Sequence, residues 1–519
     1  MLNSQNNKIK FFRRRQFLLG PEYANFDGWN RIKLDNLHLI TVHPDLKLSV
    51  SEKGENKAVL LGYFLDPFKP EHSDEDILVQ FLEEPITIDY VLKKLERLCG
   101  RFVLIIANRD NLWLFSDACA LRQVNYCFDQ EGNIWCASQP NLLAELLGFK
   151  YDKEMISFRN LPLFVSRQED FWFPCDLTPY KEIKYLLPNH YLDLTDGKVH
   201  RFWPSKGSFP NISIDECINR VSGLLKSTIK AATLRFDLKM GITAGCDTRK
   251  SLAATREVRD KITYYTHTPV KGGEADIEIP SRLLSRLGLK HHLVNLQPMD
   301  DEFKRYFNIN NTWPGERHGQ IAYSFSRYFG IDSVVLNSNI GEYSGVWYWL
   351  PKSKINGETL AVPRMLNHKM IISKLDDWLN EARPYCDEAN MNILVLFDLE
   401  LRSRWVSQSL AQYDLGFETF NPYNNRYLFQ LELSVDERLR EGRSLYMPRK
   451  LIRKMWPEVL SEPINPEKRI INKIITFISQ QHLLFPIVRL LRFYKHKRMF
   501  KSNRPSESLP DGNAGIVNK

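Results

Sequence analysis

A short polar segment in the middle of the chain has the residue types of a phosphate-binding turn. Residues 243–248 read TAGCDT. Ala244 and Gly245 screen the main chain little, so successive backbone N–H groups can converge on a phosphate, and a following helix would add the partial positive charge of its N-terminus. The threonines at both ends offer hydroxyl donors. Asp247 would repel a bare phosphate, so Mg²⁺ is its natural partner there.

The same segment also fits a simpler role. A tight connection from a strand to a helix often carries an Asp or Thr as its N-cap, and the spacing leaves both interpretations open. The segment is not a Walker A loop, because the chain has no GxxxxGK[ST] pattern. The two cations that follow, Arg249 and Lys250, either add positive charge to a phosphate site or are solvated helix residues.

The residues around this segment predict alternating helices and strands. From about residue 212, helical patterns (ISIDECINRVSGLLKSTIKAATL, TRKSLAATREVR, ADIEIPSRLLSRLG) alternate with short strand patterns (KMGIT, KITYYTHT, SVVLNS). Such alternation predicts an α/β domain with a parallel sheet. Ligands of these sheets bind beyond the carboxyl ends of the strands, and TAGCDT follows a strand in this way.

The first 200 residues predict a different architecture. AVLLGYFLDP reads as a buried strand, SDEDILVQFLEE as a helix with Ser73 as N-cap, and IDYVLKKLERLCG as a helix that stops at Gly100. Two strand–turn–strand units follow. Segregated strands and helices predict a layered α+β domain with antiparallel sheets. With the polar linker SKGSFPN as a boundary, we expect three parts: 1–205, 206–466 and 467–519.

Composition excludes several protein classes. The chain has 519 residues, 43% of them hydrophobic and 26% charged, as in ordinary soluble domains. Its eight cysteines stand singly with no CxxC pair, which argues against a zinc module or a disulfide framework and fits a reducing compartment. The apolar run QFLLG near the N-terminus is too short for a signal peptide, and no run is long enough to cross a bilayer. We therefore expect a cytoplasmic protein.

The net charge of +9 lies in one C-terminal segment. Residues 469–504 hold nine Lys or Arg and no acid, and removing these nine from 71 basic residues leaves 62, equal to the 62 acidic residues of the chain. This balance argues against a nucleic-acid-binding surface. The segment fits two roles: an amphipathic basic helix on an anionic membrane, kinked at Pro486, or a helix that docks on the preceding domain. Residues 502–519 have a disordered composition.

TAGCDT resembles the SGGxDS pyrophosphatase loop of the asparagine synthetase family, and other segments extend the resemblance. YKEIKYLLPNHYLDLTDGKVHRFWP is similar to the hairpin ahead of the family's synthetase domain, and GEADIEIPSRLLSRLGLKHHLV to its acid-then-helix segment. SVVLNSNIGEYSGVWYW occupies the place of VLSGEGADELFGGY. The resemblance covers roughly residues 20–465. The residues that fall on the Ser, Gly, Gly, Asp and Ser of the loop are Thr243, Ala244, Gly245, Asp247 and Thr248.

The resemblance implies a fold, cofactors and a reaction. It implies an N-terminal-nucleophile-like sandwich followed by a PP-loop synthetase domain that binds ATP and Mg²⁺, adenylates a carboxylate and lets an amine displace AMP. Asp247 matches the family's loop metal ligand, and Glu342 falls near the second acidic position, so both are predicted metal ligands and catalytic residues. The whole loop, Cys246 included, is the predicted nucleotide site.

The start of the chain departs from the family pattern. Glutamine-dependent members begin with a cysteine nucleophile, whereas here Met1 is followed by Leu2. The family's NGE strand end is replaced near LLGYFLDP. The segment CGRFVLIIANRDNLWLFSDACALRQVNYC still resembles the glutaminase sheet, with Asp117 and Arg122 at its D..G..PLYY place. We therefore expect a retained sandwich that no longer hydrolyses glutamine.

A second departure concerns the family's catalytic lysine, which follows an LP segment. Here Pro463 and Asn465 stand at about those positions. Lys468, three residues beyond, is the predicted catalytic replacement, and Lys450 upstream is the alternative. Loss of this cation could permit nucleotide binding without amide formation.

One further segment, NTWPGERHGQIAYSF, has two interpretations. Its polar residues could line the acceptor pocket, or the segment is a capped surface helix with solvated side chains. The residues concerned are Arg317, His318 and Gln320.

Three hypotheses about function follow. The leading one is an AMP-forming amide ligase that joins a small-molecule or peptide carboxylate to ammonia or an amine, as beta-lactam synthetases and lasso-peptide cyclases in this family do by ring closure. The second is a catalytically silent nucleotide-binding scaffold of the same fold. The third, a membrane-associated partner in surface-polymer assembly, depends on the basic tail alone. The sequence leaves the oligomeric state open.

Overall fold

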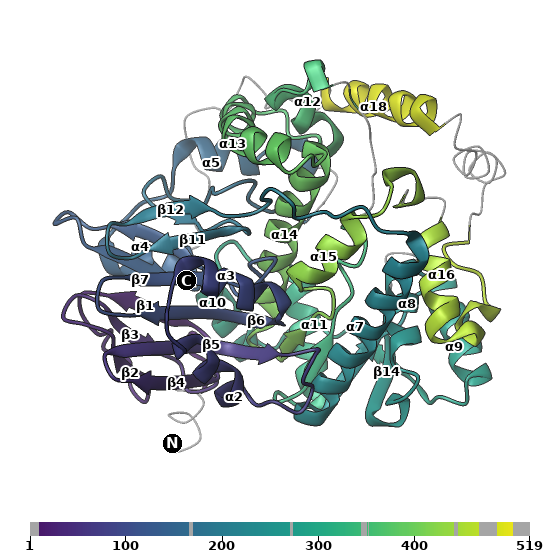
Figure 1. Ribbon diagram of the computed structural model, residues 1–519, viewed down its shortest axis with the longest axis horizontal. Helices are drawn as coiled ribbons and strands as arrows, with labels where there is room; N and C mark the ends of the chain where they lie inside the picture. Colours follow the sequence, from purple (N-terminus) through teal and green to yellow (C-terminus); the bar gives the residue numbers. More distant parts are fainter. Residues whose placement is uncertain are drawn as a thin grey trace.

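The computed structural model describes residues 10–165, 170–269, 273–343, 350, 352–440, 445–466 and 485–501. In Figure 1 the antiparallel sheets of the first half lie on one side of the molecule, and the parallel sheet with its helices lies on the other. The predicted order of an α+β half followed by an α/β half is confirmed.

Two antiparallel sheets of six strands each build the first half, in the orders β10-β8-β9-β1-β3-β2 and β12-β11-β7-β6-β5-β4. The first sheet comprises β1 (Phe17–Gly20), β2 (Asn30–Lys33), β3 (Leu39–Val42), β8 (Asn125–Phe128), β9 (Ile134–Ala137) and β10 (Lys184–Tyr185). The second comprises β4 (Leu48–Lys53), β5 (Asn56–Leu65), β6 (Cys99–Ala107), β7 (Leu112–Ser116), β11 (His190–Asp193) and β12 (Lys198–Arg201).

The two sheets pack face to face through alternate side chains. Phe17 and Leu19 of β1 share a buried cluster with Val103 and Ile105 of β6, because residues two apart point to the same face of a strand. The outer face of the second sheet packs on α2 (Asp74–Leu78) and α3 (Ile88–Arg97), and that of the first sheet packs on α4 (Pro140–Leu147). The layers are therefore helix, sheet, sheet and helix.

The second half is built on a five-stranded sheet whose paired strands all run parallel, in the order β15-β14-β13-β16-β17. Its strands are β13 (Leu238–Gly241), β14 (Ile262–Thr268), β15 (His291–Asn295), β16 (Val334–Leu336) and β17 (Glu418–Phe420). The crossovers contain α8 (Cys246–Ala254), α9 (Ala275–Arg286), α10 (Asp301–Asn310) and α11 (Glu316–Phe329). The chain reverses its direction of growth at β13, so the switch point lies between β13 and β16.

The remaining helices include α7, beside this sheet, and α12, α13 and α18, which lie at the top of the view (Figure 1). These α-helices are α5 (Lys153–Arg159), α6 (Pro162–Val165), α7 (Ile214–Arg235), α12 (Gly357–Ala361), α13 (Lys369–Glu388), α14 (Ile393–Tyr413), α15 (Arg426–Leu433), α16 (Tyr446–Met455) and α18 (Phe485–Lys501). The short 3₁₀ helices of the chain are η1 (Val79–Leu82), η2 (Arg259–Lys261), η3 (Lys352–Lys354), η4 (Val362–Arg364), η5 (Glu437–Arg440) and η6 (Pro457–Ser461). Helix α14 is buried along nearly its whole length, which fits its even hydrophobicity around the axis.

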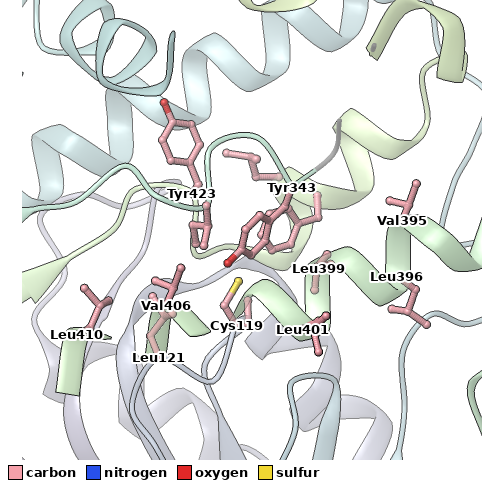
Figure 2. Packing of buried hydrophobic residues seen from close by; sticks show 14 of the residues in the cluster. Cys119, Leu121, Tyr343, Val395, Leu396, Leu399, Leu401, Val406, Leu410 and Tyr423 are labelled. Atoms are coloured by element: carbon pink, nitrogen blue, oxygen red, sulfur yellow. The ribbon is translucent and has the colours of Figure 1, made fainter. Parts of the chain in front are cut away.

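The two halves share one hydrophobic core. Tyr63 and Leu121 of the sandwich belong to the same buried cluster as Leu238 and Leu410 of the second half. Figure 2 shows this junction, where Cys119 and Leu121 lie near Tyr343 and the apolar side chains of α14. The predicted division at residue 205 therefore separates two sheet systems that are packed as one body.

An ionic network joins the same two halves. Arg101 of β6 binds both Asp414, at 2.5 Å, and Glu418, at 2.6 Å, and Arg122 binds Glu418 at 2.7 Å. Both arginines are almost fully buried. The neighbouring guanidinium groups more than offset the effect of burial and lower the pKa of Glu418, so its carboxylate stays ionised inside the protein.

Gly100 corrects the predicted end of a helix. The structure ends α3 at Arg97 and places Gly100 inside β6, so this glycine is not a helix stop. Its φ is +147°, and a Cβ at this position would lie 2.2 Å from the carbonyl oxygen of Tyr63 on the neighbouring strand. A glycine is required here because the two strands approach closely. In the local sequence such a glycine looks the same as one that ends a helix.

The described part of the basic tail is docked on the second half. Helix α18 buries Phe493 and Phe500, and the carbonyl of Phe500 accepts a hydrogen bond of 2.9 Å from Asn367. Pro486 lies in the first turn of α18 and does not kink it, because a proline is tolerated where the N–H has no helical acceptor. Across the described residues, no helix is both long and apolar enough to cross a membrane.

Candidate nucleotide site

The TAGCDT segment lies at the switch point of the parallel sheet. It follows β13 directly and opens α8, while residues 337–342 follow β16, the neighbouring strand. Two turns at the carboxyl ends of adjacent strands, on either side of a topological switch, form the standard location for a ligand in an open α/β sheet. The structure therefore brings the turns that carry Asp247 and Glu342 to the same edge.

Several of the loop's donors are used within the protein. The hydroxyl oxygen of Thr243 accepts from the amide of Gly245 at 3.0 Å and lies 3.2 Å from the hydroxyl of Thr248. The amide of Ala244 donates to the Asp276 carboxylate at 2.9 Å. The amide of Thr243 also donates to the Thr248 hydroxyl, at 3.3 Å. These bonds hold the turn in shape, so its first three amides are not available to a ligand.

The next three amides remain open. Among the described residues, no oxygen accepts a hydrogen bond from the backbone N–H groups of Cys246, Asp247 or Thr248, and Gly245, the N-cap, supplies no side-chain cap. A helix start that lacks such a cap leaves unpaired donors and partial positive charge, which suits an anion such as a phosphate. Phosphate binding by this loop stays a prediction, and the amides open to a ligand begin two residues further along the loop than the Ala244–Gly245 pair.

Asp247 is paired with a buried lysine. The Nζ atom of Lys250 lies 3.1 Å from Oδ1 of Asp247 and donates to the carbonyl of Gly341, with its ammonium 5.0 Å from the Tyr423 ring centre. Burial alone would lower the pKa of Lys250, but the Asp247 carboxylate and other neighbours more than reverse this and raise it. Lys250 is therefore a charged part of the site, and its interpretation as a solvated helix residue is wrong.

Glu342 is paired with an arginine of α14. Arg402 binds the Oε1 atom of Glu342 and also lies 3.3 Å from Asp398, one turn earlier in the helix. Burial would lower the pKa of Arg402, but these two carboxylates raise it instead. The next residue, Tyr343, is fully buried beside α14 (Figure 2) and anchors the turn on the core.

The two acidic turns are in contact through Gly341. A Cβ at Gly341 would lie 3.0 Å from Oδ1 of Asp247 and 3.0 Å from the Tyr423 ring. Each of the two carboxylates also keeps one oxygen, Oδ2 of Asp247 and Oε2 of Glu342, without a partner among the described residues. Two such oxygens fit Mg²⁺, which is commonly held by one or two carboxylates and completed by phosphate and water.

Residues 459–465, at the place where the resemblance would put a catalytic lysine, contact the TAGCDT loop and its helix. The amide of Asn465 donates to the carbonyl of Ala244 at 2.9 Å. Arg249 is completely buried and donates to the carbonyls of Val459, at 3.0 Å, and Pro463, at 3.1 Å. Arg249 thus fastens this segment to α8 and is not a solvated residue.

Of the two predicted replacement lysines, Lys468 falls outside the described residues. Lys450 is half-buried, and its Nζ atom lies 2.9 Å from the exposed carboxylate of Asp215, at the start of α7. The cation that does lie against Asp247 is Lys250, which comes from the loop's own helix.

The remaining predicted residues have structural partners. Burial raises the pKa of the Cys246 thiol to about 12, so it is neutral at physiological pH. His318 is buried with its ring 3.0 Å from the Tyr413 hydroxyl, and Arg317 donates to the carbonyl of Pro269 at 3.0 Å. Gln320 is half-buried on the same helix, α11. None of these three polar residues lies on the walls of the cavities described below.

The place before β1 is filled by arginines. The side chains of Arg13, Arg14 and Arg15 are buried. Arg14 binds Asp45 at 2.6 Å and the carbonyl of Leu415 at 2.8 Å. The cavity left beside them has a volume of about 10 Å³, which holds at most one water molecule.

Sequence reasoning missed two residues of the site and recognised a third only in part. Asp276 and Arg402 reach the two turns from α9 and α14, and Lys250 was recognised only as a candidate cation. The signal for Lys250 was its position three residues after Asp247, which places both side chains on one face of a helix. For Arg402, 60 residues after Glu342, no local signal exists.

Comparison with known proteins gives only remote similarities. No protein-family model matches the chain, and no curated protein matches it. The glutamine phosphoribosylpyrophosphate amidotransferase of B. subtilis, solved with ADP and GMP, aligns at 10% identity over 65% of this chain and 74% of its own, with a TM-score of 0.23. The NH3-dependent NAD synthetase of Campylobacter jejuni aligns at 14% identity over 38% of this chain and 96% of its own, with a TM-score of 0.21.

A glutamine-dependent NAD+ synthetase of Acinetobacter baumannii, solved with ADP, aligns at 13% identity over 39% of each chain, with a TM-score of 0.18. At these scores the superpositions carry no argument about activity.

Proposed function

We propose that this protein is an ATP-dependent, AMP-forming amide ligase with an asparagine-synthetase-like PP-loop domain and a degenerate, N-terminal-nucleophile-like sandwich. The observation that carries the proposal is the set of three open amides at the start of α8, at the switch point of a parallel sheet and next to Asp247. These amides have no acceptor within the described residues, and the anionic oxygens of a triphosphate are suitable acceptors for them.

The reaction divides into two balanced steps. A carboxylate oxygen of the substrate attacks the α-phosphorus of ATP, a C–O–P bond forms, and the bond between the α- and β-phosphates breaks to release pyrophosphate. An amine nitrogen then attacks the acyl carbon, a C–N bond forms, AMP leaves with the electron pair of the C–O bond, and the amine proton passes to solvent. The loop amides would stabilise the charge that develops on pyrophosphate.

Residues of both turns would support a bound metal. Oδ2 of Asp247 and Oε2 of Glu342 would hold Mg²⁺, which would neutralise phosphate charge when bound. Lys250 and Arg402 each bind one oxygen of these carboxylates and so fix their orientation. We assign these two cations to positioning, since each contacts a carboxylate and not the open amides.

The proposal includes the absence of glutamine hydrolysis. It is supported by the burial of Arg13, Arg14 and Arg15 before β1 and by the small volume, about 10 Å³, of the cavity beside them. The proposed nitrogen donor is free ammonia or a substrate amine.

The test is ATP–pyrophosphate exchange in the presence of a mixture of carboxylic acids, combined with calorimetric titration of the full chain with Mg·ATP. We expect exchange in the unmodified protein and its loss in Asp247→Ala. The matched control is Asp260→Ala, an exposed acid in η2 that precedes β14 at the opposite edge of the sheet. An absence of heat with Mg·ATP would disprove the nucleotide site itself.

A second candidate, a nucleotide-binding scaffold without catalysis, has its own supporting observation. Both acids of the site are already neutralised by cations, and an asparagine, Asn465, meets the loop where the family has a lysine. The same titration separates the candidates. Heat with Mg·ATP but no exchange with any carboxylate favours the scaffold.

A further inference from the structure

A cavity of about 360 Å³ lies between the two halves of the protein, next to the candidate nucleotide site. One wall comes from α6 and the segment near Trp172, in the first half, and the other from η4 and α14, in the second. Its volume is within the range of sites that enclose small organic molecules. No residue predicted from the sequence as functional lines it.

The walls are largely aromatic and apolar. Phe164, Trp172 and Trp405 line the cavity together with Met365 and Leu401. The indole rings of Trp172 and Trp405 are only half-buried, although both pack on the shared core. Half-exposed tryptophans in a concave site provide flat surfaces on which an aromatic ring can stack.

Two arginines and one carboxylate, Asp170, form the polar part of the lining. Arg364 and Arg402 both bind Asp398, which is 4% exposed and lies between them. Arg364 uses one N–H group in this contact, and its other N–H groups have no partner among the described residues. With its side chain 34% exposed, Arg364 presents a planar set of donors to the cavity, which matches the geometry of a carboxylate.

Arg402 connects the cavity to the nucleotide site. Its guanidinium lines the cavity and also binds Glu342, whose neighbour Gly341 contacts Asp247. The side chain of Arg402 thus lies between a molecule in the cavity and the turns that carry the two acids. The cavity is correctly placed to hold the second reactant of the proposed reaction.

We propose that this cavity binds the carboxylic acid that the enzyme activates, and that this acid carries a bulky aromatic group. The inference deepens the proposed function and rests on it for the fate of the acid. Arg364 binds the carboxylate, and the two tryptophans enclose the ring. A small polar acid such as an amino acid would leave most of the apolar wall uncovered, so it gains little from this site.

The docked tail helps to shape one wall. His496 of α18 lies 3.2 Å from the carbonyl of Pro363, which lines the cavity beside Arg364. The same helix binds Asn367 through the carbonyl of Phe500. The position of Arg364 is therefore fixed from outside the cavity by α18.

The experiment is calorimetric titration of the full chain, without nucleotide, with 1-naphthylacetate and with its neutral analogue 1-naphthylacetamide. We expect the acid to bind at least about tenfold more tightly than the amide, because a charge-assisted contact to Arg364 distinguishes them. In Arg364→Gln the acid should lose about tenfold in affinity while the amide keeps its own. Asp398 retains Arg402 as a partner in this variant, so the fold is preserved.

Two further variants complete the design. Trp405→Leu should weaken both probes to a similar extent, and the matched control Arg438→Gln, at an exposed pair with Asp436, should change neither. Equal affinity for acid and amide, unchanged acid binding in Arg364→Gln, or no binding of either probe would overturn the inference.

The outcomes also separate this inference from the proposed function. If the acid binds as expected but Mg·ATP gives no heat, the ligase proposal fails and the cavity remains an arylcarboxylate site. If Mg·ATP binds and exchanges but neither probe binds, only the assignment of the cavity fails.

Discussion

The ammonium nitrogen of Lys250 lies 3.1 Å from Oδ1 of Asp247, inside a loop that the sequence assigns to phosphate and metal. Lys250 is 3% exposed, so its charge is shielded from water, whereas the Asp247 side chain is 23% exposed. A buried charge without a partner is costly, and each member of the pair therefore depends on the other. The acid at the centre of the site is thus held in one orientation before any ligand binds.

The first prediction concerns the strength of this pair. Lys250→Met should lower the free energy of unfolding by about 3 kcal/mol, because Asp247 is left without its cation. Adding Asp247→Asn to that variant should recover about 1 kcal/mol or more, as expected for coupled neighbours. Urea unfolding measures both. The control pair, Lys226 and Glu257 on the surface, should show less than about 1 kcal/mol of coupling. Equal effects in the two pairs would contradict the burial of Lys250.

The second prediction concerns the contact between the two turns. Gly341→Ala adds a Cβ 3.0 Å from Asp247 and from the Tyr423 ring, so one of the turns must shift. We expect a loss of about 1–3 kcal/mol in stability and about a tenfold weaker affinity for Mg·ATP. Gly223→Ala, in an exposed part of α7 with open space around its Cα, is the control and should be slightly stabilising. Normal nucleotide affinity in Gly341→Ala would show that the turns act independently.

The third prediction concerns the junction of the two halves. Arg101→Met leaves Asp414 and Glu418 short of a cation in the interior and should cost about 3–5 kcal/mol. Because the halves share a core, fluorescence and circular dichroism should report one unfolding transition at the same denaturant concentration. Arg220→Met, at an exposed pair with Glu216, should have little effect. Two separate transitions in the unmodified chain would show that the halves fold independently.

The fourth prediction is a pH dependence of stability. Burial lowers the pKa of His267 to about 4, with Arg317 acting in the same direction and Asp276 against it. Between pH 6.5 and 4, His267 is protonated in the unfolded chain but not in the folded chain. The free energy of unfolding therefore falls by about 1.4 kcal/mol for each unit by which the pH decreases. Above pH 6.5 this contribution is complete and constant.

The measurement is the difference in unfolding free energy between the unmodified chain and His267→Gln at several pH values. We expect the difference to be constant above pH 6.5 and to change by up to about 3 kcal/mol down to pH 4. A difference that stays constant across the whole range would show that His267 titrates equally in both states.

The periodicity of the sequence was sufficient to predict most elements near the site. The strands at β13, β14 and β16 and the helices α7 and α9 lie where their apolar patterns place them, because each has one face or both in the core. The position of TAGCDT at the end of a parallel strand follows from the same patterns. Glu342 was found through resemblance, not periodicity, and its role stays a prediction.

Contacts between distant segments could not be predicted in this way. Arg249 and Lys250 follow each other in a polar run, and their burial depends on the segment 459–465 and on Gly341, which fold over α8 from far along the chain. Gly100 was assigned to a helix end, because a glycine that lets two strands approach looks the same in sequence. The arginines before β1 were similarly ambiguous, since a basic run is usually solvated.

The filled space before β1 has a consequence for how nitrogen would reach the reaction. Arg13 to Arg15 are buried there, and under the proposed function the sandwich hydrolyses no glutamine and supplies no ammonia of its own. An amine must then diffuse in from bulk water, and only its unprotonated form can attack an acyl carbon. Turnover should therefore rise with alkalinity in ammonium solutions and remain insensitive to added glutamine.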